Sequence, residues 1–136
     1  MNILVFDVGQ SIIGIQRSQH GRYIPYYGDD RIKALERLEK SDQIVTFNGN
    51  RYDIDELNKL SMTLRGKEFK PPELHFDMSE IYWPNILGSS LINTFSDYFE
   101  SDKKFPDTYE GSNAADVYMT LMLFRRWKDS LVTEKI

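Results

Sequence analysis

The segment IVTFNGNRYDIDEL, residues 44–57, changes from a strand pattern to a helix pattern within a few residues. Its first part is apolar and β-branched, which is typical of a buried strand. The pair Asn48-Gly49 then marks a turn, and apolar residues recur at helical spacing up to Leu57. Asp53 stands at the boundary, where it would either cap the helix or present a carboxylate beyond the end of the strand. Strand–turn–helix units of this kind build layered α/β folds.

Four further segments have strand patterns. An almost continuous apolar run at residues 2–7 predicts a strand buried on both faces, and a hairpin of two strands follows it. Pro25 places the last strand of the hairpin at an edge of the sheet. The five predicted strands cover residues 2–7, 11–18, 20–27, 43–47 and 73–78. A three-stranded meander followed by two parallel crossovers predicts an α/β fold with a central mixed five-stranded sheet flanked by helices.

The predicted helices begin at polar residues that suit the N-cap position. Asp29 and Asp30 precede the first helix, and Ser90 precedes the third. The four helices cover residues 30–40, 53–64, 91–100 and 113–130. The last is the longest, and its inner stripe consists of Ala114, Val117, Leu121, Phe124 and Trp127.

The composition is that of one soluble globular domain spanning residues 1–136. Of the 136 residues, 40% are hydrophobic and 28% are charged, and the net charge is -4. The acidic balance argues against a broad phosphate-binding surface, but a metal ion can bridge acids to phosphates. The absence of cysteine excludes thiolate metal sites, and two histidines are too few for a His-built metal centre unless carboxylates help. No apolar run reaches the roughly 20 residues that cross a bilayer, and no basic leader is present, which predicts a cytoplasmic protein without a membrane partner.

Ligands of an open α/β sheet collect beyond the carboxyl ends of its parallel strands. Asp7 closes the first strand, Asp53 follows the fourth, Asp77 closes the fifth, and a fourth candidate, Asp116, lies one turn into the last helix. We call Asp7, Asp53 and Asp116 the acid set. Acids that converge repel one another unless a cation neutralises them, and oxygen-only ligands suit Mg²⁺ or Mn²⁺. The sequence therefore predicts a site for one or two ions, which could activate water against a phosphodiester.

Each acid also has a structural interpretation, which the sequence leaves open. Asp53 alone would serve as a helix cap, Asp7 as a turn residue, and Asp116 as a favourable charge near a helix N-terminus. Asp77 and His75, at the end of the fifth strand, are more simply interpreted as structural residues. Only the joint placement of the acids favours a functional site.

The motifs resemble those of the DEDD 3′–5′ exonucleases, which have a ribonuclease H-like fold. The similarity is closest to the compact branch related to the proofreading domains of family B polymerases. VFDVG at residues 5–9 looks like the first motif, and SNAADVYMTLMLFRRW at residues 112–127 looks like the third. The second motif, with Asn48-Gly49, Tyr52-Asp53 and Leu57, is the most specific. The resemblance covers nearly the whole chain.

This resemblance implies that the acid set binds two divalent ions, Mg²⁺ or Mn²⁺, and that water attacks the terminal phosphodiester. The implied partner is nucleic acid, a single-stranded 3′ end of DNA or RNA. The residues that would shape the site or contact the substrate are Asn48, Gly49 and Tyr52.

Two positions depart from the family pattern. The first motif is normally Asp-x-Glu, but Gly9 replaces the glutamate, and Ser112 stands where a Tyr or His orients the attacking water. A serine hydroxyl is not a useful base near neutral pH. Losing both groups should cost several orders of magnitude in rate. Two interpretations follow, an exonuclease of weak activity or a catalytically inactive pseudonuclease that binds nucleic acid or another protein.

A third interpretation comes from the first hairpin. FDVGQSIIGI at residues 6–15 also resembles the resolvase-like branch of the same fold, in which Asp-x-Gly is normal, so that Gly9 would replace nothing. That branch also requires a glutamate at the end of a middle strand, and this sequence does not supply one. The resolvase-like nuclease therefore ranks third.

Overall fold

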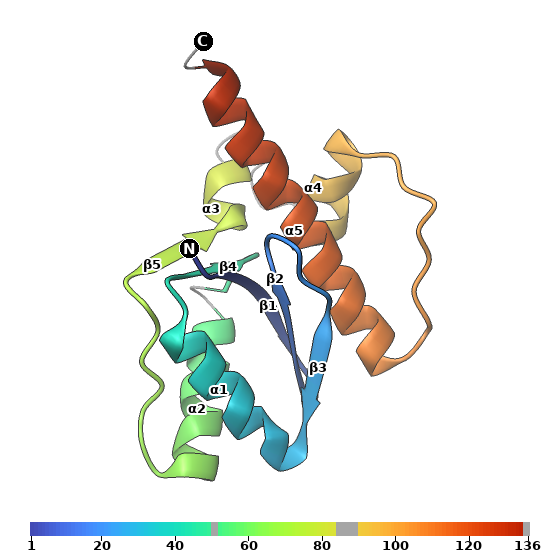
Figure 1. Ribbon diagram of the computed structural model, residues 1–136. Coiled ribbons are helices and arrows are strands. Elements are labelled where there is room, and N and C mark those ends of the chain that lie inside the picture. Colours follow the sequence, from blue (N-terminus) through green and yellow to red (C-terminus); the bar gives the residue numbers. More distant parts are fainter. Residues whose placement is uncertain (50–51, 84–89, 135–136) are drawn as a thin grey trace.

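A computed structural model describes residues 1–49, 52–83 and 90–134, and it contains one mixed five-stranded sheet (Figure 1). The strand order is β3-β2-β1-β4-β5. The strands are β1 (Ile3–Gly9), β2 (Ile12–Arg17), β3 (Ile24–Tyr27), β4 (Gln43–Thr46) and β5 (Leu74–Asp77). The predicted fold class, an α/β architecture with a mixed five-stranded sheet flanked by helices, is confirmed.

The pairing of the strands follows the predicted meander and crossovers. Strands β1, β2 and β3 are antiparallel neighbours, whereas β4 and β5 run parallel to β1. Pro25 lies in the edge strand β3, opposite Gly14 of β2. The edge position explains why a residue without a backbone N–H is tolerated there. Because β1, β4 and β5 run in the same direction, their carboxyl ends face the same edge of the sheet.

Helices cover both faces of the sheet, because successive strand residues point to opposite sides. On one face Leu4 and Ile44 pack against α1 (Arg31–Lys40) and α2 (Asp53–Arg65). On the other face their neighbours Val5 and Val45 belong to a second core cluster. That cluster is completed by α3 (Met78–Tyr82), α4 (Leu91–Tyr98) and α5 (Tyr109–Glu134). Figure 1 shows the long α5 crossing this second face.

Several boundaries differ from the prediction. The last helix begins at Tyr109 rather than at residue 113, because Thr108 accepts a hydrogen bond from Gly111 N at 2.9 Å and so caps an earlier first turn. Asp29 and Asp30 lie in a 3-10 turn, η1 (Gly28–Asp30), and Asp30 makes no capping bond with its side chain. The third strand is shorter than predicted and begins at Ile24.

The predicted cap of α4 agrees with the structure. Ser90 accepts a hydrogen bond from Asn93 N at 3.2 Å and caps α4 as predicted. Helix α2 begins at the predicted residue and ends at Gly66, whose φ of 70° is the left-handed conformation that favours glycine. Within the described residues, no helix is both long and apolar enough to span a membrane.

Candidate functional site

The three members of the acid set line one pocket of about 390 Å³. Asp7 reaches it from β1, Asp53 from the first turn of α2, and Asp116 from the second turn of α5. The remaining lining residues are Phe47, Asn48, Tyr52, Trp83, Ser90 and Leu91. We call this space the acid pocket. Residues up to 109 positions apart in the chain thus meet because β1, α2 and α5 converge at the carboxyl edge of the sheet.

Asp7 and Asp116 lie close enough in the acid pocket for each carboxyl group to shift the pKa of the other. Burial, and then the negative charges of Asp53 and Asp116, raise the pKa of Asp7 well above its usual value. Burial also raises the pKa of Asp116, which the hydrogen bond to Asp7 partly offsets. Both carboxyl groups therefore keep their protons to a higher pH than a free aspartate does.

Asp53 does not cap helix α2. The N-cap is Tyr52, which makes no capping bond with its side chain, and Asp53 is the first helical residue. Asp53 is 9% exposed, and its Oδ2 has no hydrogen-bond partner within the described part of the chain. Burial, and then the charges of Asp77 and Asp116, raise the pKa of Asp53 to about 7. A buried carboxylate oxygen without a partner is costly, and this oxygen is available to accept from a ligand.

The raised pKa of Asp53 predicts a pH dependence of stability. A raised folded-state pKa means that the group stabilises the protein at low pH and that this contribution is lost as the pH rises through about 7. Relative to Asp53→Asn in EDTA, the free energy of unfolding of the wild type should fall by about 2 kcal/mol between about pH 5 and about pH 8. Urea titrations of both proteins measure the difference. A difference that stays constant over this range would contradict the raised pKa.

The donor chemistry of the acid set fits a hard divalent cation, because it offers carboxylate oxygens, one of them without a partner. As they stand, however, no three Asp, Glu, His or Cys side chains in the described parts of the chain form a group that could hold an ion. The charges of Asp53 and Asp116 raise the pKa of Asp7, so a bound cation would relieve repulsion within the acid set.

The turn after β4 sets the position of Asp53. Asn48 has a φ of 64°, a conformation that asparagine adopts more readily than most residues, and its N–H donates to Asp77 Oδ1 at 2.5 Å. A Cβ on Gly49 would lie 2.3 Å from Thr46 Oγ1, so only glycine fits at this position. Both residues of the Asn-Gly pair are therefore required by the path of the backbone into α2.

Asp77 and His75 make structural contacts and do not line the acid pocket. Asp77 caps α3 by accepting hydrogen bonds from Ser79 N at 3.0 Å and from Ser79 Oγ at 2.8 Å. His75 Nε2 and Thr46 Oγ1 are hydrogen-bonded at 2.7 Å, and burial lowers the pKa of His75. The simpler interpretation of both residues agrees with these contacts.

Asn113 of α5, which the sequence analysis did not single out, holds Asp7 in place. Its Nδ2 donates to the main-chain oxygen of Asp7 at 3.0 Å and to Asp7 Oδ2 at 3.3 Å. Its Oδ1 accepts a hydrogen bond from the Tyr23 hydroxyl at 2.7 Å, and Asn113 is only 2% exposed. The amide therefore links Tyr23, just before β3, and α5 to the first residue of the acid set. The sequence held one signal for this role, because Asn113 is a polar residue on the same helical face as the buried Val117. The signal was missed because the helix was predicted to begin at Asn113, where a polar residue is expected.

The same amide explains the glycine in the first motif. A Cβ on Gly9 would lie 2.9 Å from Ile12 Cγ2 and 3.3 Å from Asn113 Nδ2. A Cβ on Gly14, opposite Asp7 in β2, would lie 1.8 Å from Asn113 Oδ1. The two glycines leave room for Asn113, so a neutral amide stands close to the place where the resembled family has its second acid.

We expect Asn113→Ala to destabilise the protein by about 1 kcal/mol and to weaken Mn²⁺ binding about tenfold, because the Tyr23 hydroxyl loses its acceptor and Asp7 its support. Urea titration and calorimetry measure the two effects. The matched control is Asn58→Ala, which removes an amide that accepts from Phe69 N at 3.1 Å away from the acid pocket. This control should lose stability without losing affinity for Mn²⁺. Equal affinity in wild type and Asn113→Ala would contradict the role of the amide.

Of two further predicted site residues, Tyr52 lines the acid pocket and Ser112 does not. Tyr52 lines the rim of the acid pocket and is 58% exposed, so its ring is available to a ligand. Ser112 is exposed on α5, and it lines a neighbouring pocket rather than the acid pocket. The Ser112 side chain therefore does not lie where it could orient a water molecule beside the acids.

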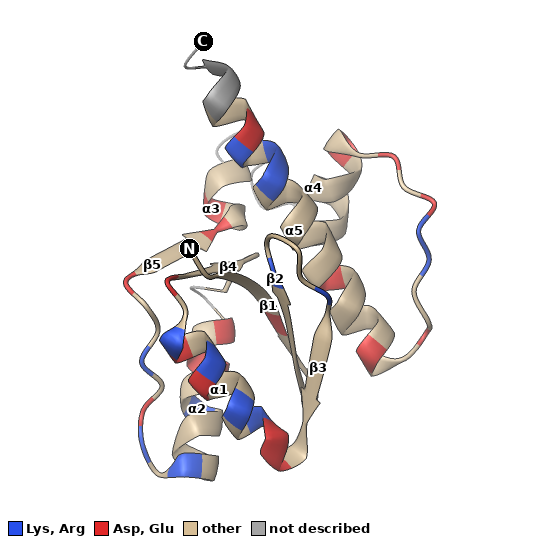
Figure 2. Ribbon diagram, in the orientation of Figure 1, with Lys and Arg blue, Asp and Glu red and all other residues tan. Residues whose placement is uncertain are grey.

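The charges are distributed unevenly over the fold. Figure 2 shows Lys and Arg mainly on α1, on α2 and on the C-terminal half of α5. In the first twelve residues of α5 the only charged residues are the acids Glu110 and Asp116. A phosphate that approaches the acid pocket therefore meets negative charge, and its binding there requires a cation.

Comparison with known proteins identifies the superfamily. The family model described as the RNase H superfamily matches residues 11–131, which include Asp53 and Asp116 and begin just after Asp7. No curated protein matches the sequence. Nucleases with this fold generally use divalent metal ions, and the fold points to nucleic-acid binding and nuclease-type processing. The match spans most of the chain and agrees with the mixed sheet flanked by helices, so the protein belongs to the RNase H superfamily.

Proposed function

We propose that this protein is a 3′–5′ exonuclease-like hydrolase that cleaves phosphodiester bonds at single-stranded 3′ ends of DNA or RNA. The observation that carries the proposal is the convergence of the acid set in one pocket, with an unpartnered buried oxygen on Asp53. Membership of the RNase H superfamily supports nuclease-type chemistry at a coarser level.

In this proposal the acid set holds one or two Mg²⁺ or Mn²⁺ ions. A bound ion supplies a water of lowered pKa and neutralises charge on the leaving oxygen. The chain itself does the positioning. Asn113 orients one oxygen of Asp7, and the turn at Asn48 and Gly49 directs Asp53 toward the pocket. Tyr52 at the rim offers an exposed ring to the substrate.

The proposal is tested by incubating a 5′-labelled single strand with the protein and Mn²⁺ and resolving the products on a gel. Progressive shortening from the 3′ end, absent in EDTA, is the expected result. If high concentrations of the intact protein leave the strand uncut in Mn²⁺ and Mg²⁺, the catalytic claim fails.

The second candidate function is a pseudonuclease that binds nucleic acid or another protein without cleaving it. Two observations favour it, the exclusion of a side chain at Gly9 and the position of Ser112 outside the acid pocket. Calorimetry with Mn²⁺ separates the two functions. Micromolar binding that Asp7→Ala abolishes favours the enzyme, whereas millimolar or absent binding by a folded protein favours the pseudonuclease. The resolvase-like alternative gains no support, because the lining of the acid pocket within the described residues includes no glutamate.

A further inference from the structure

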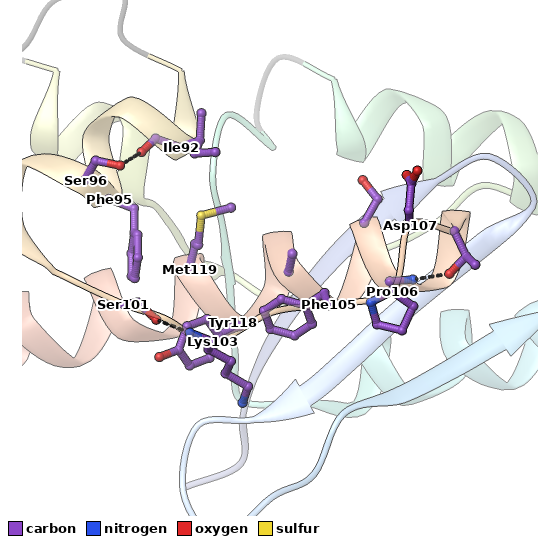
Figure 3. Close-up of a pocket in the computed structure, with 14 residues that line it drawn as sticks. Ile92, Phe95, Ser96, Ser101, Lys103, Phe105, Pro106, Asp107, Tyr118 and Met119 are labelled. Carbon is purple, nitrogen blue, oxygen red and sulfur yellow. Dashed lines mark hydrogen bonds between the residues drawn. The ribbon is translucent and has the colours of Figure 1, made fainter.

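A second pocket opens beside the acid pocket, between α4, the connection at residues 99–108, and the start of α5. Its volume is about 450 Å³, and Figure 3 shows the 14 residues that line it. Ser112 and Ala115 contribute to its wall, one turn and one residue before Asp116. Ile92 lies in the same wall, next to Leu91 of the acid pocket. Neighbouring residues of α4 and α5 therefore line the two pockets.

The walls of this second pocket suit a flat aromatic group. The rings of Phe105 and Tyr118 lie with their centroids 5.7 Å apart, and Phe95 and Met119 line the pocket from α4 and α5. Lys103 Nζ lies 4.5 Å from the centroid of Tyr118 (Figure 3). Aromatic side chains bind nucleobases by stacking, whatever the base, and an ammonium beside them can pair with a phosphate of the same strand.

The pocket is held in shape by close contacts of the backbone. A Cβ on Gly111 would lie 1.9 Å from Pro106 O, so the connection lies directly on the first turn of α5. Thr108 fastens the same turn, since its side chain accepts from Gly111 N and its main-chain oxygen accepts from Ser112 N, both at 2.9 Å. Ser112 lines this pocket with a small, exposed side chain one helical turn before Asp116.

We propose that this second pocket, the base pocket, binds the nucleobase of the terminal nucleotide of a single strand whose last phosphodiester lies in the acid pocket. The volume falls within the range of about 300–1,000 Å³ that is typical of small-molecule sites. The inference rests on the proposed function, because the acid pocket determines which nucleotide reaches the base pocket. In this inference, α4 and residues 99–108 recognise the end of the nucleic-acid strand.

The test compares two labelled single strands, identical except that one ends in a nucleotide and the other in an abasic sugar. Binding is measured by fluorescence anisotropy in Ca²⁺, which replaces Mn²⁺ to prevent turnover. The wild type should bind the strand with the terminal base about tenfold more tightly. Ala115→Phe should abolish this preference by filling the base pocket, and Ser112→Tyr should do the same from an exposed position where folding tolerates bulk. Met62→Phe, which adds bulk on the exposed face of α2, should keep the preference.

A second measurement separates this proposal from the proposed function. Adenosine carries no phosphate, so its binding to the base pocket needs no ion and can be followed by NMR in EDTA. Saturable binding that Ala115→Phe removes supports the base pocket even where the protein cleaves nothing. Equal affinity of the wild type for the two strands, with cleavage and Mn²⁺ binding intact, overturns the base pocket and leaves the proposed function standing.

Discussion

The variant Asp53→Asn should lose at least about 100-fold in Mn²⁺-dependent cleavage of a single strand and should bind Mn²⁺ too weakly to measure by calorimetry. The substitution keeps the shape of the side chain but removes the negative charge from the best-buried member of the acid set. A metal ligand contributes several kcal/mol to the transition state, and each 1.36 kcal/mol is a factor of ten in rate.

The fold of Asp53→Asn should survive, because the charge that it removes is repelled by Asp77 and Asp116. The matched control is Asp55→Asn, which removes the same charge two residues along α2 at an exposed position. Cleavage and circular dichroism are measured for both variants beside the wild type. Comparable activity in all three folded proteins would remove Asp53 from the site and leave the pseudonuclease as the better interpretation.

Gly9→Glu should destabilise the protein by about 3 kcal/mol rather than restore the second acid of the first motif. The new Cβ would lie 2.9 Å from Ile12 Cγ2, and the carboxylate would have to pass Asn113 beside the charges of Asp7 and Asp116. Overpacking and an additional buried charge therefore act in the same direction.

Urea titration measures this loss, and Gln10→Glu is the control, since it adds the same charge at an exposed neighbouring position. The double variant Gly9→Glu with Asn113→Ala removes one of the two obstructing side chains. Its destabilisation should be smaller than the sum of the two single effects, because the two sites are in contact. A stable Gly9→Glu protein with increased cleavage would show instead that the site had simply lost its glutamate.

Much of the fold could be predicted because its signals are local. The buried strand at β4, the Asn-Gly turn and the apolar stripe of α2 are each encoded within a few residues. The start of α5 was misjudged because Gly111 is a poor helix former. Glycine is nevertheless required at this position, because a Cβ on Gly111 would lie 1.9 Å from Pro106 O. No local sequence pattern reveals that contact.

The features of the candidate site likewise fall into those that local sequence encodes and those that depend on distant contacts. The sequence by itself determined the α/β class, the five strands and the choice of the three aspartates of the acid set. These follow from side-chain periodicity and turn chemistry, which act over short stretches of chain.

Only the tertiary structure decided how the acids meet and what surrounds them. It placed Asp53 with an oxygen unpartnered instead of capping α2, filled the space beside Gly9 with Asn113, and directed Ser112 into the base pocket. The physical reason is that burial, repulsion between carboxylates and the room for a side chain depend on residues about 100 positions away. Such contacts exist only after β1, α2 and α5 have packed together.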